Sequence, residues 1–182
     1  MTNDLKEIIL SKEQIAVRIK ELGAKISCDY QASPPVLVGI LKGALPFMAD
    51  LMRAITIPMV YDLMAVSSYG ASTKSTGTVK IIKDLDIEIE NRDVIIVEDI
   101  VDTGLTLQYL VENLRSRQPK SLKVCTLLDK PSRRQAMIQP DYNGFEIPDF
   151  FVVGFGLDYA EKYRNLPYIG VLKEEVYKKT SL

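Results

Sequence analysis

Nine consecutive residues, 98–106, concentrate groups that could do chemistry. Three carboxylates, Glu98, Asp99 and Asp102, lie within five residues and would repel one another unless a cation or several hydroxyl groups lay between them. The turn Thr-Gly-Leu-Thr (103–106) follows directly, and its backbone N–H groups and two hydroxyls could hold an anion where a helix begins. Carboxylates that could bind a cation or sugar hydroxyls thus lie next to hydrogen-bond donors that could bind a phosphate. A sugar phosphate with magnesium is a ligand that needs both.

The composition restricts the chemistry further, because the chain contains no histidine. This absence excludes a Ser-His-Asp triad, a Cys-His pair, a histidine general base and nearly every catalytic zinc site. Any proton transfer must therefore use Asp, Glu, Lys, Arg, Tyr or backbone groups.

Short apolar segments alternate with amphipathic helices along the chain. Strands are predicted at 36–40, 59–67, 79–83, 94–97, 121–128, 151–154 and 168–172, and helices at 12–28, 44–55 and around 107–114. Ser11 and Gln14 form a capping-box pattern at the start of the first helix. The alternation predicts an α/β fold, a mostly parallel sheet flanked by helices on both faces. No linker, repeat or charge run divides the chain, so we expect a single domain over residues 1–182.

In such a sheet, ligands bind beyond the carboxyl ends of the strands. Residues 98–106 follow one predicted strand, the pair Lys42-Gly43 follows another, and Lys130 follows a third. We therefore expect Lys42 and Glu98 on the same edge of the sheet. The segment Asp84-Leu85-Asp86 superficially suggests an aspartyl phosphotransferase nucleophile, but a charged turn is the preferred interpretation.

Three segments resemble a known family. Residues 94–106 (VIIVEDIVDTGLT) resemble the phosphoribosyl-pyrophosphate motif of type I phosphoribosyltransferases. Residues 41–43 (LKG) and 151–159 (FVVGFGLDY), which run on to Arg164, narrow the resemblance to hypoxanthine-guanine phosphoribosyltransferases. The resemblance covers nearly the whole chain. It implies a type I fold with a small hood and a mobile loop, and Mg²⁺-dependent purine salvage from phosphoribosyl pyrophosphate and a 6-oxopurine base.

The resemblance also implies roles for the residues of the central motif. Asp102 would take the proton from purine N7, and Glu98 and Asp99 would hold the ribose hydroxyls, directly or through magnesium-bound water. The 5′-phosphate loop would consist of Thr103, Gly104, Leu105 and Thr106. The chemistry agrees, because departing pyrophosphate leaves an oxocarbenium-like ribose, magnesium neutralises the departing oxygens, and a carboxylate can accept a proton as N9 attacks.

Further roles are implied outside the central motif. Pyrophosphate would be bound by Lys42, Gly43, Ser68, Tyr69 and Arg164, with a cis peptide bond before Lys42. The purine would contact Lys130 through O6 and N7, Phe151 by stacking, the Val152 backbone, and Asp158. The metal ligands would be Glu98 and Asp99, with Asp158 holding a second magnesium ion. The small-residue segment 69–78 would form a lid that excludes water from the ribose.

Charge and composition limit the possible partners. A net charge of −1 and a pI of about 5.6 predict no binding to nucleic acid. No segment reaches the roughly 18 apolar residues that span a bilayer, and the polar residues 1–12 predict no secretory signal. The two distant cysteines predict reduced thiols in a cytoplasmic protein. We further expect a homodimer or homotetramer. The alternative is a regulator on the same fold that senses phosphoribosyl pyrophosphate and binds RNA or DNA, which would need a basic face. The preference among hypoxanthine, guanine and xanthine is left open.

Overall fold

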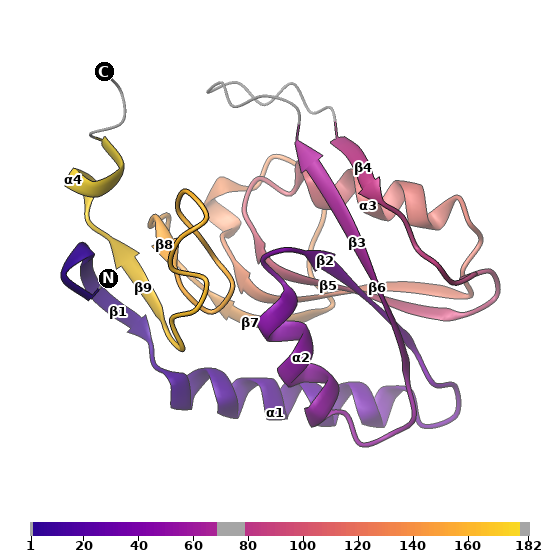
Figure 1. The fold of residues 1–182 in the computed structure, drawn as a ribbon. Coiled ribbons are helices and arrows are strands. Elements are labelled where there is room, and N and C mark those ends of the chain that lie inside the picture. The colour runs from indigo at the N-terminus through magenta and orange to yellow at the C-terminus, as the bar shows by residue number, and fades with distance from the viewer. Residues whose placement is uncertain (1, 69–78, 179–182) are drawn as a thin grey trace.

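The computed structural model describes residues 2–68 and 79–178, which form two β-sheets (Figure 1). The strands are β1 (Leu5–Leu10), β2 (Val36–Leu41), β3 (Val60–Ser68), β4 (Val79–Lys83), β5 (Asp93–Val101), β6 (Ser121–Asp129), β7 (Tyr142–Glu146), β8 (Val152–Val153) and β9 (Ile169–Leu172). The helices are α1 (Lys12–Asp29), α2 (Leu45–Ala54), α3 (Leu105–Arg115) and α4 (Glu174–Tyr177), with 3-10 turns η1 (Thr2–Asp4) and η2 (Pro131–Arg133). The six-stranded sheet has the order β4-β3-β2-β5-β6-β7, and the three-stranded sheet has the order β1-β9-β8.

The larger sheet is parallel except for β4, which runs antiparallel to β3. Its central strands are buried on both faces, which explains their continuous apolar sequences. Leu37 and Ile95 pack with α1 and α2, whereas Val38 and Ile96 pack with α3 on the opposite face. The predicted α/β fold with helices on both faces is therefore confirmed.

The first helix begins as its sequence predicts. The Ser11 hydroxyl accepts a hydrogen bond from the Gln14 backbone N–H, and the Gln14 side chain accepts one from the Ser11 N–H. This reciprocal capping box satisfies N–H groups that the first turn leaves unpaired. The buried face of α1 then packs against α2 and β7.

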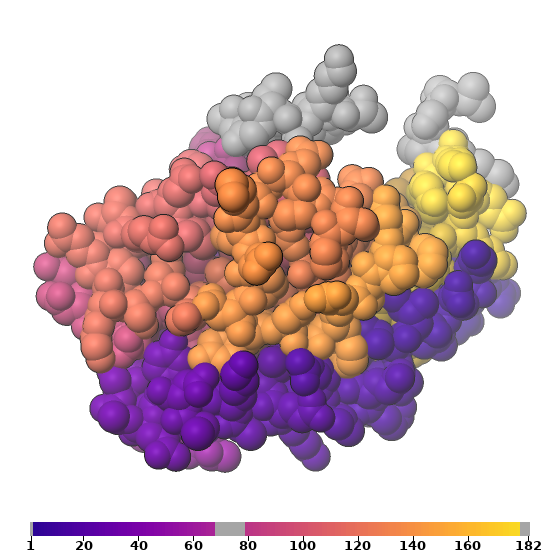
Figure 2. All heavy atoms as spheres, turned by 180° about the vertical axis from the view of Figure 1, so that it is seen from behind, coloured from indigo at the N-terminus to yellow at the C-terminus, as the bar shows by residue number. Residues whose placement is uncertain are grey.

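The smaller sheet corresponds to the expected hood, but its strands were only partly predicted. Strand β1 was missed because only Leu5 and Leu10 are buried and the residues between them are polar or partly exposed. The predicted strand 151–154 shortens to the two residues of β8, and β7 and α4 were also missed. Figure 2 shows the N-terminal and C-terminal segments side by side at one end of the molecule, where the Lys173 N–H donates to the Asp4 carbonyl.

Strand β5 is longer than predicted, because it continues to Val101 instead of ending at Val97. Its partner β6 also extends, so that Glu98 pairs with Thr126 and Val101 with Asp129. Two of the three acidic residues of the central motif therefore belong to the sheet itself. Tyr69 and the predicted lid 69–78 lie outside the described residues. Among the described helices, none combines the length and apolar character that crossing a membrane requires.

Candidate active site

The carboxyl ends of β2, β5 and β6 share one edge of the sheet, because these strands are parallel. Val101 at the end of β5 pairs with Asp129 at the end of β6, so Asp102 and Lys130 leave the sheet side by side. Lys42 follows the end of β2 on the same edge. The sheet thus brings three predicted segments to one edge, as expected from the sequence: residues 42–43, residues 98–106 and Lys130.

A hollow of about 560 Å³ lies at this edge, and many of the predicted site residues line it. The predicted residues around it are Lys42, Gly43, Glu98, Asp99, Thr106, Asp158 and Arg164. Ser67 also lines it, and Glu161 joins the lining from the loop after β8. Segments far apart in the sequence therefore meet here around carboxylates and cations.

The turn after β2 approaches the acidic residues so closely that it needs glycine. A Cβ atom at Gly43 would lie 1.7 Å from the Asp99 carboxylate oxygen Oδ2, where no side chain fits. The peptide bond between Leu41 and Lys42 is cis, as the family resemblance implied. The backbone of this turn and the Asp99 carboxylate therefore form one wall of the hollow.

Glu98 and Asp99 are held in a state that favours protonation. Burial, with a further contribution from Asp99, raises the pKa of Glu98 well above its usual value. Burial also raises the pKa of Asp99 to about 6, although its carboxylate accepts a hydrogen bond of 2.8 Å from the Ile100 N–H. Arg164 opposes this increase and Asp158 adds to it. Such a buried acidic pair is suited to a cation that would compensate its charge.

No three His, Cys, Asp or Glu side chains among the described residues form a preassembled metal site. Magnesium commonly uses one or two protein carboxylates and takes its remaining ligands from phosphates and water. Glu98 and Asp99 fit that sparse mode for one ion, and Asp158 fits it for a second, with a phosphate-bearing substrate completing the coordination.

The raised pKa of Asp99 predicts a pH-dependent cost to stability in chelator-treated protein. Between about pH 4 and 6 the folded state retains a proton that the unfolded chain releases, so the free energy of unfolding falls as pH rises. We expect Asp99→Asn, which cannot ionise, to unfold with a free energy about 2–3 kcal/mol higher than wild type at pH 7.5, and to lose this advantage near pH 4.

Urea unfolding at both pH values, with excess chelator, measures this difference. Asp86→Asn is the matched control, because the Asp86 side chain is 79% exposed and lies away from the hollow. If Asp99→Asn is no more stable than wild type at pH 7.5, or is more stable by the same amount at both pH values, the raised pKa of Asp99 is contradicted.

Opposite the acids, two cations are held by carboxylates. Arg164 lies 2.8 Å from Asp158 and 3.4 Å from Glu161, and it also donates to the Gly156 carbonyl. Lys42 lies 2.9 Å from Glu161, and this hydrogen bond lowers the pKa of Glu161. Glu161 therefore bridges the two predicted pyrophosphate-binding cations.

The predicted phosphate loop leads into α3. Gly104 is the N-cap residue of α3 and has a φ of +79°, a left-handed conformation that favours glycine. Leu105 is the first helical residue, and its N–H lies 3.4 Å from the Thr103 hydroxyl. The first turn of α3 thus directs its N–H groups towards the same edge of the sheet, where an anion is favoured.

Beside the hollow, Lys130 and Asp102 belong to a cluster of four charges. The Lys130 ammonium is buried, donates 2.7 Å to the Phe150 carbonyl, and lies 3.9 Å from Asp102 and 3.7 Å from Asp149. Arg133 donates to Asp102 at 2.9 Å and to Asp149 at 3.3 Å. The Lys130 ammonium can only donate hydrogen bonds, and Phe150 takes one of its three donors.

Phe151 and Val152 lie in the hood and do not line the hollow. Phe151 is 40% exposed, and its ring stacks on Tyr177 at 4.7 Å and meets Tyr159 edge-on at 5.7 Å. Val152 pairs with Val171 in the small sheet. These residues connect to the charged cluster through the Phe150 carbonyl. Ser68 ends β3, and only its backbone is described.

Three residues of this site were not predicted from the sequence: Arg133, Asp149 and Glu161. Glu161 could have been suspected from its place between Asp158 and Arg164. Arg133 and Asp149 carry no local pattern, because their importance comes from contacts between separate segments.

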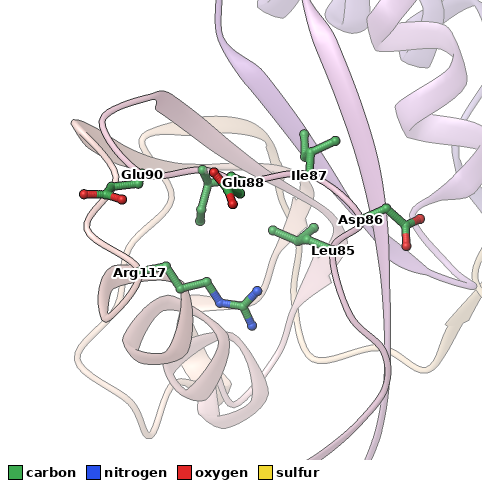
Figure 3. Close-up of a pocket in the computed structure, with 7 residues that line it drawn as sticks. Leu85, Asp86, Ile87, Glu88, Glu90 and Arg117 are labelled. Carbon is green, nitrogen blue, oxygen red and sulfur yellow. The ribbon is translucent and has the colours of Figure 1, made fainter.

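A second hollow, of about 420 Å³, lies at the opposite edge of the sheet, between residues 85–90 and Arg117 (Figure 3). Arg117 there lies 2.8 Å from the Asp84 carboxylate, and Lys83 lies 2.9 Å from Asp86. These pairs agree with the interpretation of residues 84–86 as a charged turn. The segment is remote from the carboxyl ends of the parallel strands and contributes nothing to the site.

Comparison with known proteins shows the family to which this chain is related. The model of the phosphoribosyl transferase domain matches residues 6–160. Hypoxanthine-guanine phosphoribosyltransferase of Bacillus subtilis is 59% identical over 177 residues, which are 97% of this chain and 98% of that protein. The corresponding enzyme of Streptococcus agalactiae is 55% identical over 179 residues, 98% of this chain and 99% of its own.

Solved structures agree with the sequence relatives. A crystal structure of a hypoxanthine phosphoribosyltransferase from Staphylococcus aureus superimposes with a TM-score of 0.94 at 58% identity, covering 97% of this chain and 96% of that one. A hypoxanthine phosphoribosyl transferase from Trypanosoma cruzi gives a TM-score of 0.91 at 42% identity, covering 97% and 95%. By sequence and by fold, the chain belongs to the phosphoribosyl transferase family.

Proposed function

We propose that this protein catalyses purine salvage by transferring the 5-phosphoribosyl group of phosphoribosyl pyrophosphate to N9 of hypoxanthine and guanine. The products are IMP or GMP and pyrophosphate. The single observation that carries the proposal is the meeting of a buried acidic pair, two cations and a helix start around one hollow, with Lys130 and Asp102 beside it. The names of the relatives support the same activity.

In this proposal each wall of the hollow binds one part of the donor. The N–H groups of residues 103–106 hold the 5′-phosphate, and Glu98 and Asp99 hold the ribose hydroxyls. Lys42, Gly43 and Arg164 bind pyrophosphate, which must compete with Glu161 for the two cations. Positive charge that develops on the ribose ring is stabilised by the nearby carboxylates as the bond to pyrophosphate breaks.

The acceptor base lies beside Lys130 and Asp102. Lys130 donates to O6, and to N7 once Asp102 has accepted the N7 proton as N9 attacks the ribose. Phe151 supplies a ring on which the base stacks, the Val152 backbone contacts the edge of the base, and Asp158 completes the purine side. Ser68 and Tyr69 are proposed to contribute to pyrophosphate binding.

One magnesium ion would be held by Glu98 and Asp99 and a second by Asp158, each together with the donor, and their charge would stabilise departing pyrophosphate. We expect excess chelator to lower product formation by at least about 10²-fold, because several negative charges collect beside three carboxylates. Titrating Mg²⁺ back into chelated enzyme should restore the rate. Full turnover in chelator would remove the metal from the proposal.

We further infer that the chain forms a single domain and assembles into a homodimer or homotetramer. Exposed apolar side chains on strands β3 and β4 provide a surface for that contact: Val60, Tyr61 and Ile82. Both cysteines, Cys28 and Cys125, are unpaired, in agreement with a reducing cytoplasm. Neither nucleic acid nor a membrane is a proposed partner.

A steady-state assay with hypoxanthine, guanine, xanthine and adenine tests the proposed activity and ranks its acceptors. We expect the first two to be used and adenine to be refused. Failure of all four bases in the presence of phosphoribosyl pyrophosphate and Mg²⁺ would refute the proposal.

A further inference from the structure

The carboxylate of Asp102 is held by Arg133, a residue that no motif singles out. Nε of Arg133 donates to Oδ1 of Asp102 at 2.9 Å, and its Nη1 donates to Oδ2 of Asp149 at 3.3 Å. Within residues 2–68 and 79–178, Arg133 is the only side chain that donates a hydrogen bond to Asp102. One guanidinium thus ties Asp102 to a second carboxylate.

The backbone that carries Arg133 is fixed to the strand end that carries Asp102. The Lys130 N–H donates to the Val101 carbonyl at 2.9 Å, and the Arg133 N–H donates to the Lys130 carbonyl at 3.0 Å. Farther along, the N–H groups of residues 135 and 136 both donate to the Thr103 carbonyl, at 2.9 and 3.1 Å. Bonds on both sides of Asp102 therefore set the position from which Arg133 reaches it.

The contact leaves one oxygen of Asp102 free for chemistry. Oδ1 is taken by Arg133, whereas Oδ2 lies 3.9 Å from the Lys130 ammonium, too far for a hydrogen bond. A carboxylate held through one oxygen cannot rotate freely about its last torsion. The second oxygen is then directed at the space beside Lys130, where the base is proposed to bind.

A purely structural role for the Arg133 contact is a weak explanation. The two side chains are 45% and 40% exposed, and ion pairs between exposed side chains contribute little to stability. A role in orienting Asp102 explains the contact better, because a small displacement of a catalytic group can lower the reaction rate by a large factor.

We propose that Arg133 is a positioning residue that holds Asp102 so that Oδ2 accepts the purine N7 proton. This inference rests on the proposed function and on the role assigned there to Asp102. It adds Arg133, and through it Asp149, to the residues on which the reaction depends.

A double-mutant cycle tests the inference. We expect Arg133→Gln to lower kcat for hypoxanthine about tenfold, a part of the 10²–10⁴ that a general base supplies, with KM for phosphoribosyl pyrophosphate unchanged within about twofold. In an Asp102→Asn background the same substitution should have almost no further effect, because residues that act as a unit are not additive. Arg133→Lys should recover most of the lost rate.

Arg53→Gln is the matched control, because it removes an exposed guanidinium that pairs with Asp50 on α2, away from the site. Thermal melting of each variant verifies the fold. A wild-type rate for Arg133→Gln, or an equal tenfold loss in both backgrounds, would overturn the inference while leaving the proposed activity intact. A wild-type rate for Asp102→Asn would instead remove the base assigned in the proposed function, and the role of Arg133 with it.

Discussion

Asp102→Asn is expected to lower the forward kcat by about 10²–10⁴ while leaving the fold and substrate binding in place. The amide has nearly the shape of the carboxylate, and it can still accept a hydrogen bond from Arg133, which lies 2.9 Å from Oδ1. It cannot accept the N7 proton, so only proton transfer should suffer. Single-turnover rates with preformed ternary complex separate this step from binding and release.

The control for this variant is Asp50→Asn, which makes the same chemical change on the exposed side of α2. It should behave as wild type. If Asp102→Asn retains the wild-type rate within twofold, Asp102 has no part in the proton transfer.

Lys130→Met is expected to lower kcat/KM for 6-oxopurines strongly. It should also reduce the ratio of kcat/KM for hypoxanthine to that for adenine. The Lys130 side chain is 7% exposed and can only donate hydrogen bonds. A 6-oxopurine presents an acceptor at O6, whereas adenine presents an amino donor at the same position. A site built on one hydrogen-bonding pattern can reject the opposite pattern by about 10⁴. Ratios of kcat/KM for the two bases measure the effect.

Lys123→Met provides the comparison, because Lys123 also lies on β6 but pairs with Asp141 and is 46% exposed. Its substitution should leave the ratio unchanged. If Lys130→Met discriminates as sharply as the parent enzyme, another group recognises O6.

The position of the site was predictable from the sequence because it depends on local patterns and a general rule. Apolar segments such as 36–40 predicted parallel strands, and the residues after those strands had to share one edge. The acids at 98–102 were conspicuous because they directly follow the apolar run 94–97. The resemblance to a family then supplied roles that spacing alone could not.

The remaining features depend on contacts between distant segments. Strand β5 runs on through Glu98 because β6 offers backbone partners as far as Asp129, which no local pattern indicates. The need for glycine at position 43 comes from Asp99, more than fifty residues later. Arg133 reaches Asp102 only because η2 is tied to the end of β5. Such features become visible only in three dimensions.

The measurement that tests the central claim most directly is the conversion of isotopically labelled hypoxanthine by the purified protein with phosphoribosyl pyrophosphate and Mg²⁺. The account predicts labelled IMP and pyrophosphate in equal amounts, and loss of both in excess chelator. Labelled hypoxanthine that remains unchanged, or pyrophosphate released without nucleotide, would contradict it.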